Sequence, residues 1–147
     1  MPVRTRRWND PAAPEEGTGA GLRVLVSRYR PRGVSKSAET WDEWWPELGP
    51  SRALHAAFYG KGEEGEAAAG GISFEEYAPR YLEEMQAQVF RIRALADRVA
   101  AGETVTLLCS SACTDPARCH RTLLQRLIET RVAGNVGKTL PKRRPAP

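Results

Sequence analysis

Three cysteines and one histidine lie close together between residues 109 and 120. Their spacing is Cys109-x3-Cys113-x5-Cys119-His120, and they follow a run of apolar and β-branched residues that starts at Thr104. Thiols and imidazoles can act as nucleophiles, as bases or as metal ligands. The segment therefore predicts where a site lies, although it does not identify a reaction.

A nucleophilic cysteine is the first chemistry to weigh. Cys109 stands at the end of a predicted strand, before a loop and a helix, which is where phosphatase-type thiolate enzymes hold their nucleophile. Those enzymes need an arginine six positions after the cysteine, but Asp115 stands six after Cys109 and Arg118 only five after Cys113. Cys109 remains a catalytic candidate, while a small buried residue that ends a strand is the simpler interpretation.

A metal site is the second chemistry. The spacing of Cys109, Cys113 and Cys119 matches neither a zinc finger nor a known iron–sulfur motif. On a helix, neighbouring side chains such as those of Cys119 and His120 diverge by about 100 degrees, so we expect them not to share an ion. The sequence predicts no cofactor, with these three cysteines as an alternative metal site.

An anion site is the third chemistry. Three arginines follow a predicted strand in the run from Arg28 to Gly33, and two serines precede the last predicted helix. Guanidinium groups and helix N-termini suit phosphate or carboxylate, although Asp115 at that N-terminus would bring an opposing charge. His120 is the candidate for proton transfer. The candidate ligand-binding residues are Arg28, Arg30, Arg32, Ser110, Ser111, Arg118 and Arg121.

Three strands must position these residues. Apolar and β-branched runs predict strands at Leu22–Ser27 and Thr104–Cys109, with a further short strand at Val3–Trp8. Helical segments separate the first two runs, so the two strands are expected to lie parallel in one sheet. Ligands bind at the carboxyl ends of such strands. We therefore expect Arg28 and its neighbours to lie beside Cys109.

Helix signals fill the intervals between these strands. One helix is predicted from Ser51 to about Tyr59, and another from Ser73, with a capping box at Glu76 and a kink at Pro79, to Gly102. Asp115 and Pro116 predict the start of the last helix, which Gly134 should end. The aromatic segment Trp41–Pro46 is predicted as one helical turn. The pattern is that of an α/β fold, with a small, mostly parallel sheet flanked by helices.

Composition limits the class of protein. The chain has 147 residues, 41% of them hydrophobic and 27% charged, which predicts one soluble α/β domain over residues 1–134 and a basic, disordered tail over 135–147. No apolar run is long enough for a membrane span, and the basic N-terminus lacks the apolar core of a secretory signal. A cytoplasmic location is expected, without a disulfide framework.

Four stretches of the sequence together resemble a known family. They are residues 22–34, with the turn Pro31-Arg32-Gly33, residues 41–51, residues 74–85, and residues 106–121, with the triplet Cys119-His120-Arg121. Over residues 3–130 the chain resembles the bacterial domain of unknown function 488 family, which includes YeaO-like proteins. The resemblance implies a small cytoplasmic α/β protein. Because some relatives lack the loop cysteines, it also favours Arg28, Arg32 and His120 over the thiols.

The leading hypothesis is a protein that binds a small anionic, phosphate- or nucleotide-like ligand at the carboxyl ends of its strands, either as an enzyme or as a binding protein. The alternative is a non-catalytic nucleic-acid-binding module that uses the basic edge and the C-terminal tail. A second alternative is a cysteine redox or metal-binding protein. The ligand, the reaction and the oligomeric state stay open.

Overall fold

A parallel four-stranded sheet organises the protein. The computed structural model describes residues 3–11, 21–59, 71–111 and 113–142, the last of these from residue 135 by backbone alone. Strands β1 (Val3–Arg7), β4 (Val105–Cys109), β2 (Leu22–Leu25) and β3 (Glu43–Trp44) lie in the order β1-β4-β2-β3, and every neighbouring pair is parallel. The predicted α/β class and the parallel pairing of the two central strands are confirmed.

Strand β3 replaces the helical turn that was predicted for residues 41–46. Glu43 and Trp44 pair with Val24 and Leu25 of β2, and the Trp44 indole N–H donates to the backbone oxygen of Ser27 at 2.9 Å. The prediction was wrong because aromatic residues suit a short edge strand as well as a helix. Pro46 then begins the 3-10 turn η3 (Pro46–Leu48).

Three helices connect the strands. Helix α1 (Arg52–Tyr59) is short, and α2 (Phe74–Met85) and α3 (Val89–Ala100) form a nearly continuous pair. The predicted cap is present, since the Ser73 hydroxyl accepts the backbone N–H of Glu76 at 3.1 Å. The predicted interruption at Pro79 is absent, since this proline stands inside α2, which continues through it to Met85. The interruption lies instead at the 3-10 turn η4 (Gln86–Gln88).

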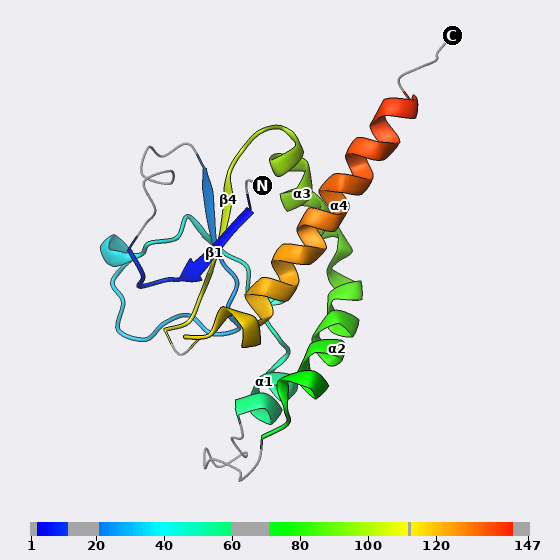
Figure 1. The fold of residues 1–147 in the computed structure, drawn as a ribbon. Helices are drawn as coiled ribbons and strands as arrows, with labels where there is room; N and C mark the ends of the chain where they lie inside the picture. The colour runs from blue at the N-terminus through cyan, green and yellow to red at the C-terminus, as the bar shows by residue number, and fades with distance from the viewer. Residues whose placement is uncertain (1–2, 12–20, 60–70, 112, 143–147) are drawn as a thin grey trace.

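Helix α4 (His120–Lys142) is the longest element of the described chain and packs against α3 and β1 (Figure 1). Asp115 caps the 3-10 turn η5 (Pro116–Arg118) rather than the helix, which corrects the predicted start. The helix also runs through Gly134, because glycine ends a helix when its φ is positive and Gly134 has no such φ. The predicted tail thus begins within α4, and residues 143–147 lie outside the described residues.

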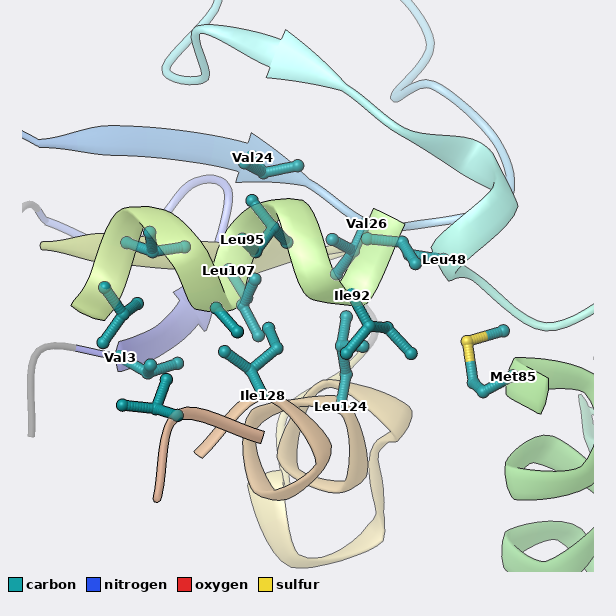
Figure 2. Close-up of a cluster of buried hydrophobic side chains, with 14 of the residues drawn as sticks. Val3, Val24, Val26, Leu48, Met85, Ile92, Leu95, Leu107, Leu124 and Ile128 are labelled. Atoms are coloured by element: carbon teal, nitrogen blue, oxygen red, sulfur yellow. The ribbon is translucent and has the colours of Figure 1, made fainter. Parts of the chain in front are cut away.

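One face of the sheet carries the main core. Val3, Val24, Val26 and Leu107 of the strand segments meet side chains of α3 and α4, as Figure 2 shows. The helical contributions are Ile92, Leu95, Leu124 and Ile128, with Met85 at the border of the cluster. Among the helices of the described residues, none is long and apolar enough to cross a membrane.

The opposite face of the sheet has a smaller cover of loop side chains. Leu25 and Leu108 pack there against Trp41, with Trp8 and Val34 at the margin. The two tryptophan rings meet edge to face, with centroids 6.0 Å apart. Loops rather than helices therefore shield this face, and the helices are segregated to the other.

Tyr81 links helix α2 to the segment that precedes α1, and this link can be tested. Its buried hydroxyl donates to the backbone oxygen of Leu48 at 2.7 Å. Tyr81→Phe removes the donor and should lower the free energy of unfolding by about 1–3 kcal/mol. Denaturant titration measures it, with Tyr29→Phe as the matched control because Tyr29 is 47% exposed. Equal stability of both variants would contradict a role for this hydrogen bond.

Candidate functional site

A small cavity of about 50 Å³ lies where the central strands β2 and β4 end. It gathers residues from the loop after β2, from the end of β4, from the start of α4 and from the segment around α1. The lining residues are Ser27, Arg28, Tyr29, Pro50, His55, Tyr59, Cys109, Ser110, Cys113 and His120. The structure thus brings Arg28, Cys109, Ser110 and His120 of the predicted residues into one place.

The three thiols form one buried cluster. The Cys109 sulfur donates a hydrogen bond to the Cys113 sulfur at 3.1 Å, and the Cys119 sulfur donates to that of Cys109 at 3.4 Å. Cys109 and Cys119 are 1% and 2% exposed, and Cys113 is 7% exposed. The thiols therefore form a chain of hydrogen bonds that ends at Cys113, the most exposed of the three.

Cys113 is the acceptor at the end of this chain. The Tyr59 hydroxyl lies 3.4 Å and the Ser110 hydroxyl 3.6 Å from its sulfur. Hydrogen bonds from Cys109 above all, then Cys119, Tyr59 and Ser110, hold the pKa of the Cys113 thiol well below its usual value, although burial opposes them. Donating these hydrogen bonds raises the pKa of Cys109, and the pKa of Cys119 is raised to about 12. Cys113 is therefore the group in the cluster best suited to be a thiolate.

Cys119 and His120 do not diverge as the helical argument predicted. Cys119 precedes α4 with an extended backbone, at φ −135° and ψ 143°, so the helical geometry does not apply to it. One donor atom from each of Cys109, Cys119 and His120 lies within 4.8 Å of the others. These three could hold a metal ion, whereas Cys113 of the predicted alternative set falls outside this group.

His120 holds the start of α4 against the end of β2. Its Nε2 atom donates to the backbone oxygen of Val26 at 2.9 Å, which leaves Nδ1 unprotonated in the neutral ring. Nδ1 lies 4.0 Å from the Cys119 sulfur. Burial lowers the pKa of His120, so the ring is neutral at neutral pH. The imidazole thus offers a base to the far end of the thiol chain.

Arg28 stands at the cavity with a fixed orientation. Its Nε atom donates to the backbone oxygen of Pro50 at 2.8 Å. Within the described part of the chain, no acceptor bonds to its two terminal nitrogens. The approach of the two segments requires Gly49, because a Cβ there would lie 2.6 Å from the Arg28 backbone nitrogen. The guanidinium therefore keeps donors available at the cavity.

Other predicted residues lie elsewhere. Arg30 pairs with Glu39 at 2.6 Å and lies over the Trp41 ring, on the face of the sheet that the loops cover. Arg32 is exposed, and Arg118 is exposed beside the Phe74 ring, 5.9 Å from its centroid. Exposed Ser111 accepts from Arg7 through its backbone oxygen. None of these residues is among those that line the described cavity.

Arg121 is a buried arginine with unsatisfied hydrogen-bond donors. It is only 4% exposed, and its Nε and Nη1 atoms are buried without a hydrogen-bond partner among the described residues. It does not line the cavity. Burial is the main cause that lowers the pKa of its neighbour His120, and the charge of Arg121 lowers it further. A buried guanidinium with unmet donors favours an anion nearby.

The aromatic rings that line the cavity were not predicted from the sequence. The His55 ring lies between Tyr29, at a centroid distance of 5.1 Å, and Tyr59, at 4.5 Å. His55 and Tyr59 are four residues apart on α1, a spacing that places two side chains on one helix face. That spacing was visible in the sequence, but nothing in it indicated that this face meets Cys113.

Comparison with known proteins identifies relatives without an established function. A family model described as DUF488-N3a, the active DUF488-N3 subclade, matches residues 3–132. Uncharacterized protein YeaO of Escherichia coli (strain K12) is 32% identical over 76% of this chain and 84% of its own. Uncharacterized protein Rv3073c of Mycobacterium tuberculosis (strain ATCC 25618 / H37Rv) is 29% identical over 88% of this chain and 95% of its own. No solved structure matches.

The lowered pKa of Cys113 has a direct consequence for its reactivity. In the native protein Cys113 should react with iodoacetamide at about pH 6 almost as fast as at higher pH, because it is already a thiolate there. In the denatured chain, the alkylation rate of each thiol should fall about tenfold per pH unit below its pKa of about 8.5. Peptide mapping by mass spectrometry gives the rate for each cysteine.

Tyr59→Phe serves as the companion variant to this pH profile. It removes one hydroxyl from the Cys113 sulfur, so the midpoint of the profile should move to higher pH. A native midpoint at or above that of the denatured chain would contradict the thiolate assignment.

Proposed function

The chain belongs to the active DUF488-N3 subclade, and from that premise we propose that it is a thiol enzyme that acts on a small anionic ligand. Arg28 binds the anion at the carboxyl ends of β2 and β4, and the Cys113 thiolate is the nucleophile. The observation that carries the proposal is the position of Arg28, with unbonded donors, at the same cavity as Cys113.

The charges around the cavity support an anion. Arg28 is the arginine that lines it, and no aspartate or glutamate is among the lining residues of the described chain. Serine and tyrosine hydroxyls supply further hydrogen-bond donors. A negative group would therefore meet a cation and neutral donors, with the Cys113 thiolate as the one opposing charge.

The size of the cavity limits what enters it. With a volume of about 50 Å³, the cavity is small compared with a nucleotide or a peptide. Only the end of a ligand fits, such as a phosphate, sulfate or carboxylate group. The rest of a larger molecule would lie outside, beside the exposed ring of Tyr29.

The chemistry follows from the thiol chain. The Cys113 sulfur lines the cavity and accepts the hydrogen bond of Cys109, which favours its thiolate form, the nucleophilic state of a cysteine. The Nδ1 atom of His120, 4.0 Å from the Cys119 sulfur, accepts the proton that leaves the thiol chain. Arg121, with its unmet donors, adds positive charge at the start of the same helix.

The nucleic-acid alternative stays a prediction. Much of the basic tail that it uses lies outside the described side chains. Two basic residues of the strand region are paired with acids, since Arg7 binds Asp10 and Arg23 binds Asp42. These pairs leave fewer free cations for phosphates of a nucleic acid.

Two alkylating reagents of equal chemistry and different charge test the proposal. Iodoacetate is an anion and iodoacetamide is neutral, so an anion site should raise the ratio of their reaction rates at Cys113 above that of the denatured chain. Arg28→Gln should lower this ratio by about tenfold, a factor that corresponds to about 1.4 kcal/mol. Inorganic phosphate and sulfate should protect Cys113 from both reagents.

Arg32→Gln is the matched control, because it removes the same charge from an exposed position outside the cavity. It should leave the ratio unchanged. A ratio that falls equally in both variants indicates only the general charge of the protein, and would sink the proposal. Absence of protection by either anion in the unaltered protein would do the same.

A further inference from the structure

We propose that Cys109 and Cys113 form a dithiol–disulfide couple that reduces a small disulfide at this cavity. The inference shares Cys113 with the proposed function but does not require an anion at Arg28. It adds a second reacting sulfur and names the class of substrate, a low-molecular-weight disulfide.

The geometry of the two sulfurs carries the inference. They lie 3.1 Å apart, inside ordinary van der Waals contact of two sulfur atoms, and their side chains point at each other. The loop folds back between them, because the Cys113 backbone N–H donates to the Ser110 oxygen at 3.0 Å. A covalent S–S bond of about 2.05 Å therefore needs only a small movement of the two side chains.

The two sulfurs differ in access. Cys113 is the more exposed, and hydroxyl groups of Tyr59 and Ser110 surround its sulfur. Cys109 ends β4, almost fully buried behind it. An incoming disulfide would thus meet Cys113 first, and Cys109 is placed to attack the sulfur of Cys113 afterwards.

Cys119 contacts Cys109, but less closely than Cys113 does. Its sulfur accepts the backbone N–H of Arg121 at the start of α4, and it lies 3.4 Å from the Cys109 sulfur. That contact fixes Cys119 at the helix start, where it donates to Cys109 and contacts the His120 ring. We assign it a positioning role rather than a bond in the oxidised protein.

The reaction has two steps that balance. The Cys113 thiolate attacks a substrate R–S–S–R, which forms a Cys113–S–S–R bond and releases one RS⁻. The Cys109 sulfur then attacks the Cys113 sulfur and releases the second RS⁻, which takes the Cys109 proton. The substrate gains two electrons and the protein loses two, with a Cys109–Cys113 disulfide as the oxidised product.

A metal ion is the rival use of the same thiols. It would bind Cys109, Cys119 and His120 and leave Cys113 out, whereas the couple uses Cys113 and leaves Cys119 out. The two assignments therefore differ in which cysteine stays free to react, and one experiment separates them.

The test treats the reduced full chain with oxidised glutathione and follows it by intact mass and peptide mapping. The unaltered protein should lose the mass of two hydrogens, with Cys109 linked to Cys113, and release reduced glutathione. Cys109→Ser should lose this disulfide and keep one glutathionyl group on Cys113. Cys119→Ser should still form the Cys109–Cys113 bond, with or without a change in rate, which distinguishes the couple from a Cys109–Cys119 bond.

Several outcomes would overturn the couple. One is a stable glutathionyl adduct on Cys113 in the unaltered protein. That result would agree with Cys113 as the nucleophile but would show that Cys109 does not resolve the adduct. Others are a Cys109–Cys119 bond, or a stoichiometric metal whose chelation is needed before Cys109 reacts. The result for the unaltered chain decides the matter even if a serine variant does not fold.

Discussion

The hydrogen bond from His120 to the Val26 oxygen is the constraint on which the site depends. It joins residues 94 positions apart and ties the first turn of α4 to the end of β2. Because Cys119 precedes His120 directly, this bond also places the third thiol against Cys109. The same bond consumes the Nε2 proton, so the imidazole can offer only Nδ1 to the cluster. One contact thus sets the position of a helix, a thiol and a lone pair.

The three thiols of the cluster differ in their hydrogen-bonding roles. In an interior of low dielectric, three equivalent thiols would resist ionisation, since burial disfavours charge. Here two sulfurs donate in sequence and the third accepts, with two hydroxyls at hand. Such a directed chain lowers the pKa of Cys113 and raises those of Cys109 and Cys119. The lowered and the raised pKa values therefore belong to different sulfurs.

Sequence reasoning predicted the parallel sheet and the convergence of Arg28 with Cys109, but not the contacts among the thiols. The two central strands and the meeting of Arg28 with Cys109 followed from apolar runs and from the rule for strand ends. The thiol contacts did not, because the extended backbone at Cys119 cannot be read from spacing. The Arg30–Glu39 pair was equally invisible, since an ion pair depends on a loop path that no periodicity encodes. Local patterns predicted elements, and tertiary contacts decided which side chains meet.

The place of β1 in the sheet has a consequence for how the chain is made. β1 pairs with β4 in a register that sets Val3 opposite Val105, and with no other strand of the described residues. During synthesis the first strand must wait for about a hundred further residues before its partner leaves the ribosome. The pocket forms later still, because His120 follows β4. The three thiols thus emerge after β1, β2 and α1–α3, so they meet partners that are already made, and of the described helices only α4 has still to follow before His120 can close the site.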